Sequence, residues 1–235
     1  IVTDDTVFTT LAFVTFSPEG DRSFSFARKP GADTRLLFGE LDLSLIDGAR
    51  VFHFGTLSLT DEPVRTTTQK AVAYAREKGK MITFDPNLRP MLWKSEEAMA
   101  RVINGAARYA DIVMPGLGEG RILTGRESEQ DIAQYYLQRG VQTVVIKLGG
   151  SNGTYIRTEQ EEFYVPSYHV KHIVDTVGAG DGFAVGFTSG LLDGLTLEDA
   201  ARRGAAIGAM AIQVAGDNEG LPTREKLEAF QSSHS

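Results

Sequence analysis

A carboxylate stands inside a glycine-rich turn at Asp175–Phe183, whose sequence is DTVGAGDGF. A turn of this composition opens a helix, and a helix N-terminus attracts anions through its unpaired N–H groups and the positive end of its dipole. The small residues Gly178, Ala179 and Gly180 leave room for phosphate oxygens to reach those donors. Asp181 would then lie beside the bound anion, where its useful role is to orient or deprotonate a hydroxyl that attacks phosphorus.

A simpler alternative is that Asp181 only caps a helix after a glycine turn, because Asp, Thr and Gly are favoured at helix starts. Two familiar nucleotide motifs are excluded. A dinucleotide fingerprint needs a third glycine where this chain has Phe183, and the Gly-Lys-Ser/Thr of a P-loop occurs nowhere in the chain. The segment is therefore a different kind of anion cradle.

Three further segments follow expected strands, at the position where ligands bind in open α/β sheets. Asp85–Pro90 (DPNLRP) either ends a strand or offers Arg89 as a bidentate partner for a carboxylate or phosphate. Met114–Glu119 (MPGLGE) opens a helix, in which Glu119 either stabilises the helix dipole or holds Mg²⁺ through water. Lys147–Gly153 (KLGGSNG) is typical of a hairpin turn, with phosphate contact as the alternative.

Other polar residues give weaker signals. Phe26–Pro30 (FARKP) ends an expected hairpin with two cations, which either form a solvated strand edge or point from a lid into a cleft. His53, His169 and His172 lack the spacing of metal ligands, so we interpret them as structural or surface residues. Spacing alone does not select Asp217, which lies in a polar turn near the C-terminus.

Composition limits the class of protein. The 235 residues are 42% hydrophobic and 23% charged, which suits one main domain with a full core. A net charge of −7 argues against a nucleic-acid or anionic-membrane partner. The absence of cysteine excludes disulfides and thiolate chemistry and favours the cytoplasm. We find neither a signal peptide at the start nor an apolar run of the ~18 residues that span a membrane.

The elements that must position these residues begin with a hairpin over about residues 9–33, with strands at Thr9–Phe16 and Arg22–Ala27 and a turn at Ser17–Asp21. From Arg50 onward, strands alternate with helices, which predicts an α/β fold: a mostly parallel sheet with helices on both faces. The expected strands are Val51–Phe54, Lys80–Phe84, Ile112–Met114, Thr143–Leu148 and a hairpin through Thr154–Val165. The expected helices lie near Val64–Lys78, Glu96–Tyr109, Glu129–Arg139, Gly182–Leu192, Leu197–Val214 and Arg224–Phe230.

Taken together, DTVGAGDGF, FDPNLRPMLW, MPGLGEG and the RKPGAD hairpin resemble the ribokinase (PfkB) family of ATP-dependent sugar kinases, over essentially the whole chain. The resemblance implies a ribokinase-like fold with a hairpin lid, ATP and Mg²⁺ as cofactors, and a small sugar as substrate. It makes Asp181 the expected catalytic base and Glu119 the expected metal residue. The expected anion hole is Gly178, Ala179 and Gly180, and the expected nucleotide site is Lys147, Gly149 and Gly153, with Ala205 and Gly208 near the adenine.

Two halves of the chain resemble different sugar kinases. Arg28–Asp33 and Val51–Pro63 look like fructokinases, whereas Asp85–Gly125 and the tail Val174–Glu225 look like 2-keto-3-deoxygluconate kinases. The turn AGDNEGLPT in the tail is the sharper clue, because fructokinases usually have an apolar segment there. The resemblance therefore favours a sugar acid over its alternative, fructose.

The same resemblance assigns the substrate contacts. Arg28 and Arg89 would meet the sugar acid, whose carboxylate needs a cation, and Asp217 would meet one of its polar groups. Phe26 stands where the sugar-acid kinases tend to have Tyr, so a hydroxyl contact is lost.

The family's opening strands and first glycine-rich sugar segment have no counterpart, so we expect residues 1–235 to be a single kinase domain that is N-terminally incomplete. The apolar face of the hairpin suggests a homodimer. An alternative of another class is a non-catalytic sugar or nucleotide sensor, which the intact GAGD argues against and the missing N-terminal part argues for. A dinucleotide-dependent dehydrogenase has no fingerprint to support it.

Overall fold

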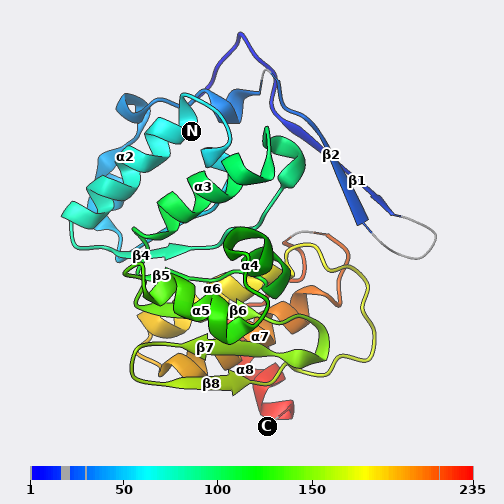
Figure 1. Ribbon diagram of the computed structural model, residues 1–235. Coiled ribbons are helices and arrows are strands. Elements are labelled where there is room, and N and C mark those ends of the chain that lie inside the picture. The colour runs from blue at the N-terminus through cyan, green and yellow to red at the C-terminus, as the bar shows by residue number, and fades with distance from the viewer. Residues whose placement is uncertain (1, 17–21, 30, 217, 235) are drawn as a thin grey trace.

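The computed structural model describes residues 2–16, 22–29, 31–216 and 218–234 (Figure 1). The expected turn Ser17–Asp21 and the candidate substrate residue Asp217 lie outside the described residues. The predicted α/β architecture is confirmed, with a six-stranded sheet between helices and a separate two-stranded hairpin.

The main sheet has the strand order β3-β4-β5-β6-β7-β8. Strands β3 to β6 pair in parallel, and β6, β7 and β8 pair antiparallel. The carboxyl ends of β3 to β6 therefore meet at one edge of the sheet, where the candidate polar segments follow β4, β5 and β6. The strands are β3 (Val51–Phe54), β4 (Met81–Phe84), β5 (Ile112–Val113), β6 (Thr143–Lys147), β7 (Thr154–Arg157) and β8 (Glu162–Val165).

Helices cover both faces of this sheet, as predicted. Because side chains alternate along a strand, Val113 and Ile146 face one core while Ile112 and Val145 face the other. The first core is shared with α1 (Leu43–Gly48), α2 (Val64–Glu77), α3 (Glu96–Ala107), α4 (Leu117–Thr124) and α5 (Glu129–Leu137). The second core is shared with α6 (Ala179–Leu192) and α7 (Leu197–Ala211), and α8 (Arg224–Ser233) packs on α7.

Close contact with α7 fixes the position of α6. A Cβ added to Gly186 would lie 2.7 Å from the Cα atom of Gly204, and one added to Gly204 would lie 2.8 Å from the main-chain oxygen of Phe183. Only glycine fits at such a crossing, so the pair brings the two helix backbones together. The N-terminus of α6 is thereby held beside the sheet.

In the part of the chain that the structure describes, no helix combines the length and the apolar character needed to span a membrane.

The hairpin consists of β1 (Leu11–Phe16) and β2 (Arg22–Ala27), which pair antiparallel and project from the body of the protein (Figure 1). Val14 pairs with Phe24, so these two side chains share one face. Leu11 and Phe13 alternate with that face and are each about half exposed. Dimerisation through the hairpin stays a prediction, and a monomer in sedimentation of the full-length protein would exclude it.

Candidate active site

The glycine-rich turn forms the N-terminus of α6, which begins at Ala179, three residues before the predicted start at Gly182. Gly178 is the N-cap and has φ of +75°, a left-handed conformation that glycine adopts without steric penalty. Asp181 therefore lies in the first turn of α6 and is exposed. The early start places Asp181 in the turn whose N–H groups have no acceptor within the helix, and such a turn attracts anions.

A cavity of about 710 Å³ opens beside this turn and has Ala179 and Gly180 in its wall. Its lining includes all five residues that the sequence predicts for the nucleotide site: Lys147, Gly149, Gly153, Ala205 and Gly208. They come from the end of β6, the turn before β7, and α7. Nucleotide binding by these residues stays a prediction, but the fold does bring them together around one cavity.

The sequence assigned no binding role to two other residues of this lining, and His169 was interpreted there as a structural or surface residue. Tyr168 and His169, in the segment between β8 and α6, are part of its lining. Tyr168 is also packed against Phe230 of α8, with ring centroids 5.3 Å apart. No local pattern marks these residues, because their position depends on how the long connection after β8 crosses α7.

Lys147 also pairs with a residue from a different strand. Its Nζ atom donates to Oδ2 of Asp85 at 2.5 Å, across the short strand β5 that separates β4 from β6. Asp85 is only 3% exposed, and burial raises its pKa while Lys147 opposes that rise. Its second oxygen, Oδ1, makes no hydrogen bond to a described residue. Asp85 was noted in the sequence only as part of a polar strand end.

Glu119 connects the loops that follow β4 and β5. Its Oε1 atom accepts from the N–H of Leu88 at 2.6 Å, and Oε2 accepts from the N–H of Gly116 at 2.7 Å. Burial raises the pKa of Glu119, and Lys147 acts against that rise. Each carboxylate oxygen keeps a further lone pair, so the group can still accept a water molecule bound to Mg²⁺. Metal binding by Glu119 stays a prediction.

Arg89 lies beneath the hairpin. Its guanidinium is 5.0 Å from the ring centroid of Phe24, which in turn stacks on Phe26 with centroids 6.4 Å apart. Nη1 donates to the side-chain and main-chain oxygens of Asn87 and to the main-chain oxygen of Leu88. The hairpin face that carries Phe24 and Phe26 thus lies over the carboxyl end of β4, and the contact between Arg89 and Phe24 links the two.

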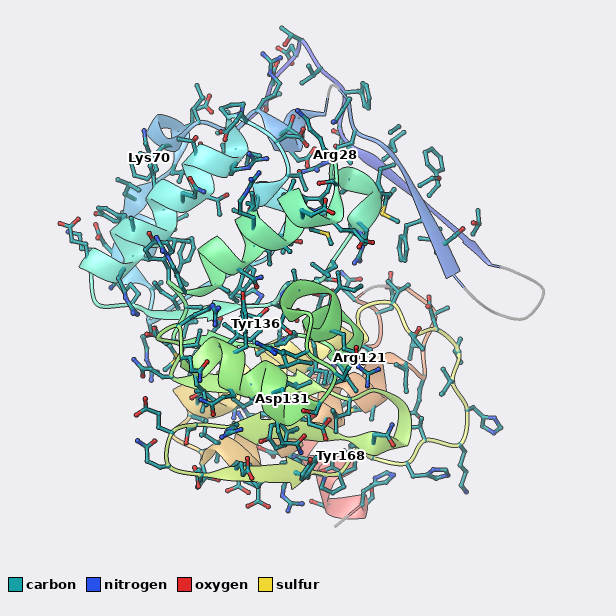
Figure 2. The ribbon with its side chains drawn as sticks, in the orientation of Figure 1. Arg28, Lys70, Arg121, Asp131, Tyr136 and Tyr168 are labelled. Carbon is teal, nitrogen blue, oxygen red and sulfur yellow. The ribbon has the colours of Figure 1, made fainter. Side chains whose placement is uncertain are left out.

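Arg28 occupies a different environment at the base of the hairpin (Figure 2). It is 5% exposed, and its guanidinium donates to Asp33 Oδ2 at 2.7 Å, to the Thr60 hydroxyl at 2.5 Å and to the Leu57 carbonyl at 2.8 Å. Asp61 Oδ2 lies 3.6 Å from Nη1. These contacts join the hairpin to the loop after β3. The predicted contact of Arg28 with substrate is untested, and any such contact would have to coexist with this set of partners.

His53 lies on the same face of the sheet as Lys147. Its Nδ1 atom is 2.8 Å from the hydroxyl of Thr83, its partner on β4. Burial lowers the pKa of His53, although part of the residue reaches solvent, while Asp181 raises it and Lys147 lowers it. The structural interpretation of His53 agrees with the Thr83 contact.

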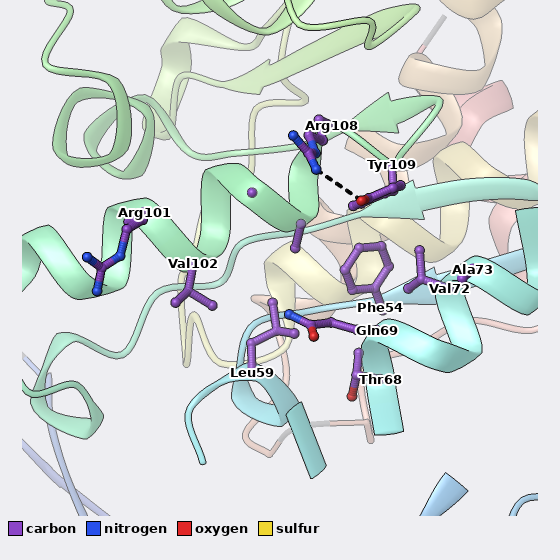
Figure 3. A pocket seen from close by; sticks show the side chains of 12 residues that line it. Phe54, Leu59, Thr68, Gln69, Val72, Ala73, Arg101, Val102, Arg108 and Tyr109 are labelled. Atoms are coloured by element: carbon purple, nitrogen blue, oxygen red, sulfur yellow. Dashed lines mark hydrogen bonds between the residues drawn. The ribbon is translucent and has the colours of Figure 1, made fainter. Parts of the chain in front are cut away.

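A second cavity, of about 410 Å³, lies between α2 and α3 (Figure 3). Apolar side chains such as Phe54 and Val72 line it, with Arg101 and Arg108 at its edge. Phe54 belongs to the first core, on the face of the sheet that α6 does not cover. This cavity offers neither a carboxylate nor a glycine cradle in its described lining, so it lies apart from the candidate chemistry.

Comparison with known proteins identifies the family. The family model described as pfkB family carbohydrate kinase matches residues 1–224. A curated relative, 2-dehydro-3-deoxygluconokinase of Bacillus subtilis (strain 168), is 43% identical over 92% of this chain and 66% of its own length. Fructokinase-1 of Oryza sativa subsp. japonica is 37% identical over 99% of this chain and 74% of its own length. The chain thus spans about two thirds to three quarters of the length of these relatives.

Solved structures agree with the sequence comparison. The structure of a protein assigned as ribokinase II from E. coli, in complex with ATP and Mg²⁺, superposes with a TM-score of 0.83 at 29% identity, over 95% of this chain and 70% of that chain. Sequence motifs, sheet topology and relatives therefore lead to one assignment. The chain belongs to the pfkB family of carbohydrate kinases.

Proposed function

We propose that the protein is an ATP-dependent sugar kinase that phosphorylates a hydroxyl of 2-keto-3-deoxygluconate or a similar sugar acid. The observation that carries this proposal is the placement of Asp181 in the first turn of α6, whose glycine N-terminus opens onto a cavity large enough for a nucleotide. A carboxylate beside an anion site repels a bound phosphate, so its presence there favours a catalytic role over simple binding.

The reaction would use these groups in sequence. Asp181 accepts the proton of the sugar hydroxyl, whose oxygen forms a bond to the γ-phosphorus while the bond from that phosphorus to the β–γ bridging oxygen breaks and ADP leaves. The N–H groups at the start of α6 stabilise the negative charge that develops on the phosphoryl oxygens. Mg²⁺, when bound, neutralises phosphate charge, and Glu119 would hold it through water.

Two observations support the sugar acid as acceptor. The chain is 43% identical to an enzyme named 2-dehydro-3-deoxygluconokinase. Arg89, at the carboxyl end of β4 under the hairpin, is a cation suited to a carboxylate, which neutral fructose lacks. The contact with Phe24 implies that closure of the hairpin over the sugar would also shield Arg89 from water, which strengthens its pairing with an anion.

Fructokinase is the second candidate, because the fructokinase-1 of Oryza sativa subsp. japonica is 37% identical to this chain. The two activities differ in their dependence on Arg89. Loss of this cation should weaken use of a sugar acid far more than use of fructose.

The test is the initial rate of ADP release from Mg-ATP by the full-length gene product, with 2-keto-3-deoxygluconate and with fructose as separate acceptors. We expect a higher kcat/KM for the sugar acid, and Arg89→Ala should raise KM for that acceptor selectively. Asp181→Asn should reduce kcat by about 10²–10⁴ with little change in ATP affinity. Near-normal turnover by Asp181→Asn would refute the assigned base. If no ADP is released with either acceptor, the result would favour a non-catalytic sensor.

A further inference from the structure

The ion pair between Lys147 and Asp85 is unusual for the amount of charge that it removes from water. The side chains of Lys147 and Asp85 are 20% and 5% exposed, and the two charged atoms are 2.5 Å apart. A buried ion pair is often no more stabilising than apolar residues of the same volume, because desolvation offsets the attraction. The pair is therefore better explained by what it positions than by the stability it adds.

The ammonium group stands at the phosphate cradle. Lys147 lines the same cavity as Ala179 and Gly180, and its Nζ atom is 3.6 Å from the point that a Cβ atom on Gly180 would occupy. An ammonium has three N–H donors. With one of them given to Asp85, two remain for the oxygens of an anion held at the start of α6.

Asp85 suits the task of holding this group in place. It follows β4, a buried strand, and its short side chain leaves the carboxylate little freedom to move. A lysine, by contrast, has a flexible four-carbon side chain and a compact charge. Without a fixed counter-ion, Lys147 would sample positions along the cavity instead of one position beside the cradle.

We propose that Asp85 is a positioning residue that fixes the Lys147 ammonium beside the cradle, so that Lys147 meets the phosphoryl group during its transfer. This inference rests on the proposed kinase function. It gives Asp85 no contact with the reacting atoms. Its contribution to catalysis passes entirely through Lys147, and that dependence can be measured.

A double-mutant cycle on the full-length protein tests the dependence. Lys147→Met should lower kcat/KM for ATP about 10²-fold, the scale expected for one lost electrostatic donor. Asp85→Asn should lower it tenfold to a hundredfold, because the ammonium is then misplaced. The double variant should match Lys147→Met within about threefold, since Asp85 has nothing left to position.

Rescue by a conservative variant separates positioning from a structural role. Other charged groups near the pair are Asp181, Glu119 and His53, and they are the same in the parent and in the Asp85 variants. Asp85→Glu, which keeps the charge, should recover part of the lost rate.

Asp193→Asn is the matched control, because it removes a carboxylate that pairs with Arg203 at 2.7 Å just beyond the far end of α6. Its kcat/KM should stay within twofold of the parent. The proposal would be overturned if the losses of the two single variants multiply in the double variant, or if Lys147→Met has the parental rate. Either result would leave the kinase assignment intact. If Asp85→Asn alone does not fold, Asp85→Glu still tests the positioning, because it keeps a counter-ion for Lys147 while displacing the ammonium; a parental rate in this variant would overturn the proposal.

Discussion

Replacing Arg28 by Met should unfold the base of the hairpin at a substantial loss of stability. The substitution keeps most of the aliphatic volume but removes three hydrogen bonds, to Asp33, Thr60 and the carbonyl of Leu57. It also removes the cation that faces Asp61 Oδ2, an oxygen that makes no hydrogen bond to a described residue, and leaves Asp61 with Lys29 alone of these two cations. Breaking a buried charge pair from one side costs about 3–5 kcal/mol.

The lower end of that range applies, because the side chain of Asp33 is 43% exposed and water can replace part of its pairing. A loss of about 3 kcal/mol corresponds to a fall in Tm of roughly 6–12 °C for a chain of this size. Thermal unfolding followed by circular dichroism measures it directly. Urea unfolding of the same samples gives the free energy independently.

Lys29→Met is the matched control, one residue along the chain. Lys29 is 73% exposed and lies 3.5 Å from Asp61, so its loss should change the unfolding free energy by no more than about 1 kcal/mol. Equal stabilities for the Arg28 and Lys29 variants would refute the assignment of Arg28 as the anchor of the hairpin. The substrate role predicted for Arg28 would then regain weight.

The helix packing and the surface charge give two further predictions. Gly204→Val should destabilise the protein by about 1–3 kcal/mol in urea unfolding, since its Cβ would lie 2.8 Å from a main-chain oxygen of α6, whereas Gly105→Ala, in an open position of α3, should stabilise it by roughly 0.5–1 kcal/mol. Hydrogen bonds from Arg203 and Arg224 lower the pKa of Asp193 from 3.8 to about 2, so its contribution to stability is present above pH 4 and is lost as the pH falls toward 2. The Tm difference between the parent and Asp193→Asn should therefore be seen at pH 6 and vanish near pH 2. A difference that persists at pH 2 would contradict the assigned pairing.

Local sequence patterns determined most of the framework. Apolar runs bounded by turns located β4 and β6, because strands buried on both faces need continuous hydrophobic side chains, and a shorter run located the partly exposed edge strand β3. The short helix α1 was not predicted, since a segment of six residues is too short to establish a helical period. The start of α6 was predicted three residues late, because a Gly-Ala-Gly sequence has low helix propensity and is ordered here by packing on α7.

The candidate site divides in the same way. The sequence alone located the cradle, because glycine next to an acidic residue at a helix start has a direct physical meaning in φ and in charge. Only the tertiary structure could show that Lys147 reaches Asp85 across β5, that Arg89 lies under Phe24, and that Arg28 is enclosed at the hairpin base. Each of these contacts joins segments far apart in the chain, and no local pattern encodes which strand ends become neighbours. The residue types therefore determine which chemistry the site can perform. The order of the strands decides which side chains become neighbours of the reactive groups.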